Sequence, residues 1–138
     1  MHIIVCIDEK GGMAFNKRRQ TRDKAVQEKI LSLIQDHTLW MRAYSRELFP
    51  DVENIQITED YLGRAQKHDY VFIEQEAFLP QKADSLLVFR WNRAYPADVY
   101  LGFEPEKQGF ILQNTCEFSG TSHQKITLCI YEREVEEQ

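Results

Sequence analysis

The sequence has few cysteines, and their arrangement does not suggest disulfide bonds. Three cysteines in 138 residues are an odd number. Cys6, Cys116 and Cys129 stand apart within apolar stretches, without the paired spacing of a disulfide framework or a zinc site. We expect buried free thiols that pack as small apolar side chains. A reactive thiol needs a neighbour that lowers its pKa, and none of the three has one nearby in the sequence.

Long apolar runs and an excess of positive charge are also missing. No segment approaches the roughly 20 apolar residues of a membrane span, and the first residues lack the pattern of a signal peptide. We therefore expect a cytoplasmic protein without a membrane partner. The 22 acidic residues outnumber the 17 lysines and arginines, for a net charge of −5, which argues against a nucleic-acid partner. The four histidines lack the mutual spacing of a metal site, so no metal is expected.

The hydrophobic residues, 43% of the sequence, follow the alternating pattern of an α/β protein. Short apolar runs without polar interruption predict strands that are buried on both faces of a sheet. These internal strands are expected at residues 3–7, 39–41, 71–73 and 86–89. After the first of them, apolar side chains at helical spacing predict a helix over residues 22–35 with Thr21 as its N-cap. A chain of 138 residues fits one domain.

Shorter elements complete the pattern. They are a weak helix at 43–49, a strand at 55–58, a helix at 59–66 and a brief helix at 76–80. Near the end, the stretches 110–118 and 126–133 read as strands, and the turn residues Ser119 and Gly120 join them into an antiparallel hairpin. An acidic segment at 132–137 follows. This order predicts an α/β fold of three layers, with helices around a mixed, mostly parallel sheet.

Several of these segments resemble the dihydrofolate reductase family. Residues 96–101 read Pro-Ala-Asp-Val-Tyr-Leu after a buried strand, the last strand closes on Tyr-Glu-Arg at 131–133, and the first strand runs into a glycine turn at Gly11 and Gly12. At the level of the fold, the resemblance covers most of the chain and implies the three-layer architecture of that family. These motifs belong to the scaffold, so they do not by themselves imply its activity.

The resemblance implies three sites that the family needs. The first is a carboxylate at the start of the first helix, which hydrogen-bonds and helps to protonate the pterin ring. Asp23 is the matching carboxylate and the candidate catalytic residue, although the turn that precedes it in the family is absent. An aspartate in a first helical turn is also favoured by the helix dipole alone. Four basic residues stand nearby, namely Arg18, Arg19, Arg22 and Lys24, so we expect Asp23 to be exposed or salt-bridged and not catalytic.

The second site binds the dinucleotide through a Gly-Arg-x-Thr motif after the second strand. Here Arg42 stands in place of the glycine and Ala43 in place of the arginine, while Ser45 keeps the hydroxyl. Arg42 and Ser45 are thus the candidate cofactor-binding residues. Farther along, Glu74 and Gln75 replace a Gly-Gly pair, and their side chains would fill the space of the phosphates. We expect no cofactor, or NADPH if the protein is a divergent reductase.

The third site is an arginine that pairs with the glutamate tail of folate. The matching stretch, residues 49–54, has two acids and no base, and so would repel that carboxylate. Four apolar or aromatic side chains stand near segments that line the family's ligand cleft: Ile4, Trp40, Tyr44 and Trp91. Large aromatic residues at such positions serve the core more often than they bind ligands.

Three functions stay open from the sequence. In the first, a dihydrofolate-reductase-like protein has altered cofactor and folate sites, is not an active dihydrofolate reductase, and binds another small molecule or a protein partner. In the second, a divergent NADPH-dependent reductase acts on a pterin or nucleotide-like substrate. In the third, the basic stretch 17–24 binds phosphate or RNA. Because several independent sites are altered together, the first hypothesis is favoured.

Overall fold

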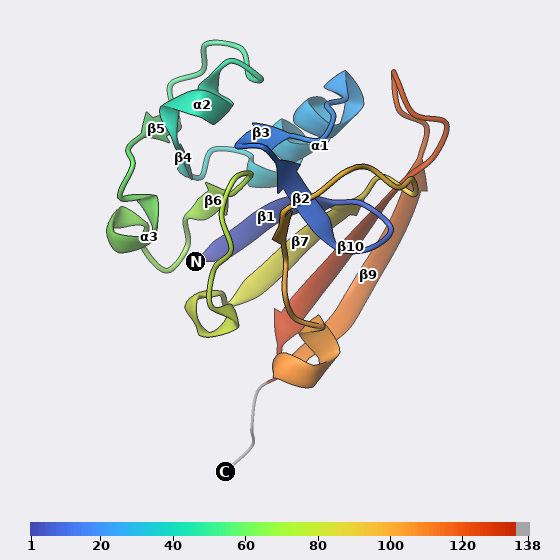
Figure 1. The fold of residues 1–138 in the computed structure, drawn as a ribbon. Helices are drawn as coiled ribbons and strands as arrows, with labels where there is room; N and C mark the ends of the chain where they lie inside the picture. The colour runs from blue at the N-terminus through green and yellow to red at the C-terminus, as the bar shows by residue number, and fades with distance from the viewer. Residues whose placement is uncertain (135–138) are drawn as a thin grey trace.

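A mixed sheet of seven strands forms the centre of the protein in the computed structural model, which describes residues 1–134 (Figure 1). The order across the sheet is β5-β4-β6-β1-β7-β10-β9. The bounds are β1 (His2–Ile7), β4 (Leu39–Met41), β5 (Ile55–Ile57), β6 (Tyr70–Phe72), β7 (Ser85–Arg90), β9 (Phe110–Phe118) and β10 (Ile126–Arg133). Strands β5, β4, β6, β1 and β7 pair in parallel, whereas β10 is antiparallel to β7 and β9. The predicted fold class is confirmed, including the hairpin of β9 and β10 at one edge.

The two strands in the middle of the sheet are buried on both faces, as their unbroken apolar runs require. Side chains alternate along β1, so that Ile3 packs into the core on one face of the sheet and Ile4 into the core on the other. Strand β7 does the same, with Val88 on the face of Ile3 and Phe89 on the face of Ile4. Strands β1 and β7 therefore set the position of the segments that begin at their carboxyl ends, at residues 8 and 91.

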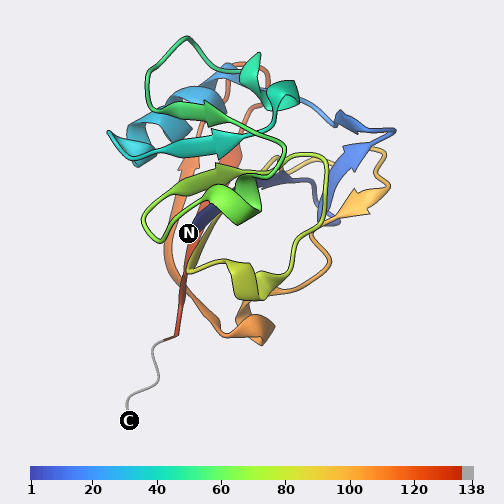
Figure 2. The same ribbon diagram turned by 90° about the vertical axis from the view of Figure 1, so that its left-hand side faces the viewer.

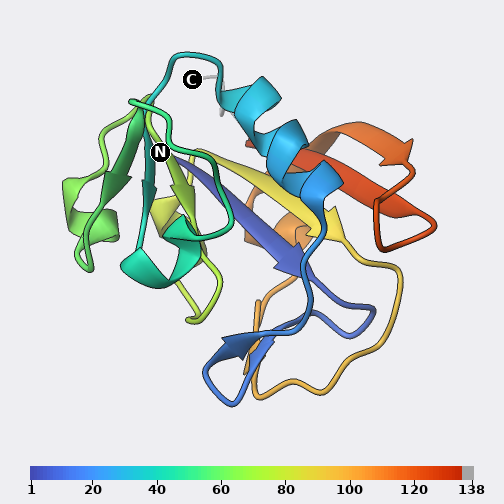
Figure 3. The same ribbon diagram turned by 90° about the horizontal axis from the view of Figure 1, so that it is seen from above.

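Different elements cover the two faces. Helix α1 (Lys24–Ile34) packs Val26, Ile30 and Ile34 against the face of Ile4. The opposite face carries a small antiparallel sheet of β2 (Gly12–Phe15), β3 (Arg18–Arg19) and β8 (Val99–Tyr100), followed by the short helix η2 (Pro105–Gln108). Figures 2 and 3 show α1 and this small sheet on opposite sides of the large sheet. Within residues 1–134, no helix has the length and apolar character needed to cross a membrane.

Some predicted elements differ from the structure. Helix α1 begins at Lys24, and its N-cap is Asp23 instead of Thr21, because the Asp23 carboxylate accepts a hydrogen bond from the Ala25 N–H. The helices predicted at 43–49 and 59–66 shrink to α2 (Ala43–Arg46) and α3 (Tyr61–Arg64).

Two further differences concern turns. The helix predicted at 76–80 is wrong, and a 3₁₀ turn, η1 (Pro80–Lys82), forms instead because proline favours the first position of a helix. The basic stretch contains the unpredicted hairpin of β2 and β3. Its turn residues Asn16 and Lys17 have φ of 50° and 64°, the conformation of a tight hairpin turn, but they lack the Asn-Gly signature that would have indicated one. The acidic segment predicted at 132–137 lies partly outside the described residues.

Candidate functional site

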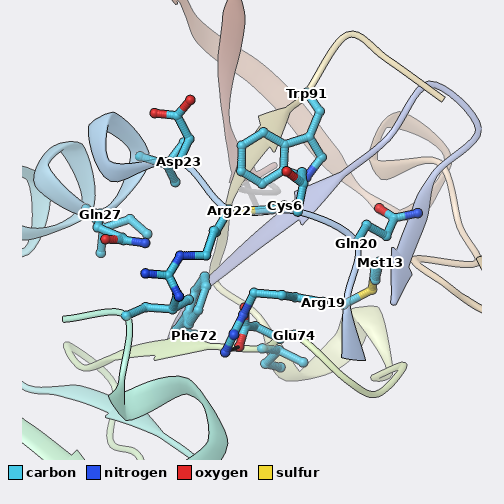
Figure 4. A pocket seen from close by; sticks show the side chains of 15 residues that line it. Cys6, Met13, Arg19, Gln20, Arg22, Asp23, Gln27, Phe72, Glu74 and Trp91 are labelled. Atoms are coloured by element: carbon cyan, nitrogen blue, oxygen red, sulfur yellow. Dashed lines mark hydrogen bonds and ion pairs between the residues drawn. The ribbon is translucent and has the colours of Figure 1, made fainter. Parts of the chain in front are cut away.

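A cavity opens where β1, β6 and β7 end. The carboxyl ends of parallel strands, where the chain turns to opposite sides of β1, are the usual place of ligands in open α/β sheets. Its lining includes the apolar side chains Cys6, Met13, Phe72 and Trp91 and the polar side chains Arg19, Gln20, Arg22, Gln27 and Glu74 (Figure 4). The volume of the cavity is only about 20 Å³, which is room for about one water molecule. Side chains therefore nearly fill this strand-end cavity.

Asp23 lies beside the strand-end cavity but directs its carboxylate away from it (Figure 4). The side chain is fully buried and accepts hydrogen bonds from the backbone N–H groups of Thr121 (2.8 Å), Ser122 (2.8 Å) and His123 (3.1 Å). The Ala25 N–H and the His123 Nδ1–H donate two more, each at 2.9 Å. The expectation that Asp23 is exposed or paired with the neighbouring basic residues is wrong, because the β9–β10 turn supplies all of its partners except Ala25.

These contacts decide the charge of Asp23. Burial opposes ionisation, but the hydrogen bonds from His123 and from the backbone outweigh it and lower the pKa of Asp23 to about 2. The fall in pKa agrees with the interpretation of Asp23 as a helix-start residue. Gly120 allows the turn to close, since a Cβ at this position would lie 2.5 Å from Asp23 Oδ2. The carboxylate is therefore an ionised anchor for the turn.

His123 extends this anchor to the end of β7. Its ring stacks on Trp91 with centroids 4.6 Å apart, and its Nε2 lies 2.9 Å from the Tyr95 hydroxyl and 3.5 Å from that of Thr21. His123 belongs to the β9–β10 turn, yet its side chain is buried. No local signal could have identified it, because its carboxylate partner is 100 positions away in the sequence.

A second charged cluster closes the ends of β4 and β6. The Arg19 guanidinium donates to both oxygens of Glu74, with Nε at 2.9 Å and Nη2 at 3.1 Å, and Ser45 Oγ donates to Glu74 at 2.8 Å. Arg19 also bonds Glu47 at 2.7 Å and lies 4.2 Å above the centre of the Tyr44 ring. Burial opposes the charge of Arg19, but the hydrogen bonds with Glu74 raise its pKa. The Glu74 side chain thus fills the strand end, and its charge is neutralised by Arg19.

The other residues proposed from the sequence lie in different surroundings. Arg42 forms ion pairs with Glu59 (3.1 Å) and Glu76 (2.7 Å). Trp40 donates from its indole N–H to Asp69 at 2.9 Å, and Ile4 is buried in the core under α1. None of these three lines the strand-end cavity, whereas Trp91 does. At the edge of the cavity, Ser45 donates a hydrogen bond to Glu74, and Tyr44 packs against Arg19.

Gln20 carries a buried acceptor without a donor. Its amide nitrogen donates to Asp8 at 3.1 Å and to the Pro96 carbonyl at 3.3 Å. Its Oε1 is buried and has no hydrogen-bond partner among the described residues. A buried acceptor left unpaired costs about 1–3 kcal/mol. Because Gln20 lines the strand-end cavity, this oxygen is available to a donor group that enters there.

The mouth of the cavity carries charged side chains of both signs. Arg22 is exposed and makes no ion pair within residues 1–134. It also borders a second hollow, which shares Arg22, Gln27 and Leu48 with the cavity. This hollow adds Lys24 and the acidic residues Glu28 and Glu47, of which Glu47 is paired with Arg19. In the acidic stretch 49–54, Asp51 pairs with Arg46 at 3.1 Å. An anionic group at the mouth would meet Arg22 and Lys24 near the start of α1, with Glu28 also in the lining.

Neither a reactive thiol nor a metal site is found in the part of the chain that the structure describes. The cysteines are free, as expected, with Cys129 buried and Cys6 and Cys116 partly buried, and burial raises the pKa of the Cys6 thiol. No group of three His, Cys, Asp or Glu side chains among residues 1–134 is arranged to hold a metal ion.

Comparison with known proteins finds a likeness in structure alone. No family model and no curated protein sequence matches this sequence. Among solved structures, a dihydrofolate reductase from Enterococcus faecalis, complexed with NADP(H) and RAB-propyl, superimposes with a TM-score of 0.66 and 12% sequence identity. The match covers 97% of this chain and 96% of the reductase. The chain therefore has a dihydrofolate-reductase-like fold.

Proposed function

We propose that this protein binds a small molecule in the strand-end cavity and does not catalyse the NADPH-dependent reduction of dihydrofolate. The observation that carries the proposal is the cluster of Arg19, Glu74 and Ser45 at the ends of β4 and β6. The reductase that it resembles in structure is described in complex with NADP(H). The case for a changed function depends on what this chain puts in the place of a phosphate site.

Dinucleotide sites of α/β proteins need bare backbone at the end of a strand, because the phosphates are held by N–H groups. Here the Glu74 and Arg19 side chains, 8% and 12% exposed, occupy that position. A pyrophosphate could enter only if this pair separated. One carboxylate would then face the phosphates without its partner, and breaking a buried pair costs about 3–5 kcal/mol.

The proton supply argues in the same direction. Reduction of a ring C=N bond needs an acid whose pKa lies near the working pH. The pKa of Asp23 is lowered to about 2, so its carboxylate has no proton to give near neutral pH. Glu74 is held by Arg19 and Ser45, so no carboxyl group among the described residues that line the cavity is unpaired.

The residues around the cavity favour a particular kind of ligand. Trp91 and Phe72 supply apolar surfaces for a flat ring, and Gln20 Oε1 requires an N–H or O–H donor from it. An anionic extension would reach Arg22 and Lys24 at the mouth. Entry requires the exposed Arg22 side chain to move, since the closed cavity has room for about one water molecule. We infer a single domain and, from the three free thiols, a reducing cytoplasmic location.

A thermal-shift screen with NADPH, folates and nucleotides tests the proposal, since a ligand of the native state raises its stability by about 2.7 kcal/mol at 100 times Kd. We expect stabilisation by one class of flat anionic ligand and none by NADPH. Gln20→Leu should abolish that stabilisation, and Gln113→Leu on the exposed edge strand β9 is the matched control. Micromolar binding of NADPH in a calorimetric titration would replace this proposal with the divergent reductase.

A further inference from the structure

A second cavity lies on the other face of the large sheet, under the small sheet and η2. Its volume is about 620 Å³. Its walls come from the turn after β1, the end of β7 and the segment 100–106 (Figure 1). This Arg90 cavity is named after the side chain that β7 contributes, and it shares no lining residue with the strand-end cavity.

Arg90 is a fixed cation without a carboxylate partner among residues 1–134. Its backbone is held between Ile7 of β1 and Thr127 of β10, and its Nη2 donates to the Tyr131 hydroxyl at 3.2 Å. Burial opposes its charge, but hydrogen bonds with Tyr131 and Cys129 raise the pKa of Arg90. No ion pair involves this half-buried guanidinium within residues 1–134. Most of its N–H donors are therefore unused by the protein.

Acidic side chains line the same cavity without reaching Arg90. They are Glu9, Glu104 and Glu106. Glu104 pairs with Lys107 at 2.9 Å, whereas Glu9 and Glu106 form no ion pair in the described part of the chain. Lys10 adds a second cation at the rim. Charges of opposite sign thus line one hollow without touching, and a ligand that carries both signs could neutralise them.

Apolar surface is present beside these charges. Phe103 is partly buried and packs edge-on against Phe78, with ring centroids 5.7 Å apart, and Tyr100 is 46% exposed. Both line the Arg90 cavity. A small hydrophobic group that lay here would leave water and keep its charged end near Arg90.

We propose that the Arg90 cavity binds a small zwitterion of the α-amino-acid class with an aromatic or apolar side chain. Arg90 binds the carboxylate, for which the guanidinium is the best-matched donor. Glu106 and Glu9 attract the ammonium group, and Phe103 contacts the side chain. A ligand with only one of the two charges leaves the opposite wall unpaired, which is the source of the selectivity.

Calorimetric titration of the full chain with three matched probes tests this. L-Phenylalanine has both charges, 3-phenylpropionate lacks the ammonium group, and 2-phenylethylamine lacks the carboxylate. We expect L-phenylalanine to bind at least about tenfold more tightly than either analogue, which corresponds to about 1.4 kcal/mol. An absence of heat from millimolar L-phenylalanine, or equal affinity for 3-phenylpropionate, would overturn the proposal.

Variants locate the binding. Arg90→Met should weaken L-phenylalanine at least tenfold, and Glu106→Gln should weaken it while leaving 3-phenylpropionate unchanged. Glu117→Gln, an exposed glutamate on β9, is the charge-matched control. If Arg90→Met does not fold, Glu106→Gln decides, and an unchanged affinity for L-phenylalanine contradicts the proposal. Loss of this binding in Gln20→Leu would move the ligand to the strand-end cavity and equally reject the site at Arg90.

Discussion

The two cavities handle their charges in opposite ways. In the strand-end cavity, Arg19 and Glu74 form an ion pair, and the cavity volume is about 20 Å³. In the Arg90 cavity, Arg90 forms no ion pair with Glu9 or Glu106 in the described residues, and the cavity volume is about 620 Å³. A closed buried pair fills its space with side chains and is costly to break, whereas separated charges leave space between them and can each pair with a ligand. The contrast is between a closed ion pair at the strand-end cavity and an unpaired cation in the Arg90 cavity, and it can be tested by substitution.

The largest effect is expected from the anchor that supports the strand-end cavity. Asp23→Ala removes the acceptor of five hydrogen bonds and leaves buried N–H groups unpaired. We expect the free energy of unfolding, measured with urea, to fall by about 3–5 kcal/mol. Asp98→Ala, which removes one exposed hydrogen bond to the Asn16 N–H, should cost less than about 1 kcal/mol. Equal losses in the two variants would show that the β9–β10 turn does not depend on Asp23.

Arg19→Met tests whether the closed pair stabilises the protein. It leaves Glu74 buried with only Ser45 as a partner, so we expect a loss of about 3 kcal/mol in the free energy of unfolding. Arg19→Met combined with Glu74→Met should recover most of this loss, because neither charge is then left alone. A double variant as unstable as the single variant would mean that packing of Arg19 on Tyr44, and not charge, carries the effect.

The pH dependence of stability provides a third test. In the folded protein, the pKa of Asp23 is lowered to about 2 from its ordinary value of 3.8. Its contribution, about 2 kcal/mol by linkage, is therefore present above about pH 4 and is lost as the pH falls through 2. Urea unfolding of the wild type and of Asp23→Asn between pH 2 and 6 measures it, and the difference in stability between the two proteins should shrink as the pH falls. A constant difference would show that ionisation of Asp23 does not stabilise the fold.

The smallest effect on stability is expected in the Arg90 cavity. Arg90→Met removes the hydrogen bonds with the Tyr131 hydroxyl and with Cys129, and no ion pair in the described residues. We expect the free energy of unfolding to change by less than about 1 kcal/mol, in contrast to the loss of about 3 kcal/mol for Arg19→Met. Circular dichroism during urea unfolding compares the two variants directly. A loss as large as that of Arg19→Met would assign Arg90 to the structure and remove the contrast between the cavities.

Local patterns in the sequence determined the central strands and the main helix of this protein. Unbroken apolar runs identified β1 and β7 as strands buried on both faces, and helical spacing identified α1, because burial periodicity is a property of neighbouring residues. The sequence also predicted that the side chains of Glu74 and Gln75 would fill the end of a strand, and in the structure Glu74 lines the cavity. It indicated Trp91 among the residues near the cleft, and the structure has Trp91 in the cavity wall.

Only the tertiary structure decided which charged groups meet. Asp23 finds its partners about 100 positions away in the β9–β10 turn, and Arg19 finds Glu74 at a separation of 55. The basic neighbours of Asp23 in the sequence suggested a different pairing, since sequence proximity says nothing about which loop folds back onto a helix start. In the sequence, Arg90 stands at the end of a strand. Its lack of a carboxylate partner among the described residues follows from the order of the strands and the path of residues 100–106. Strand order is set by the packing of the whole chain, so the contacts that distinguish a closed ion pair from an open cavity are absent from any local pattern.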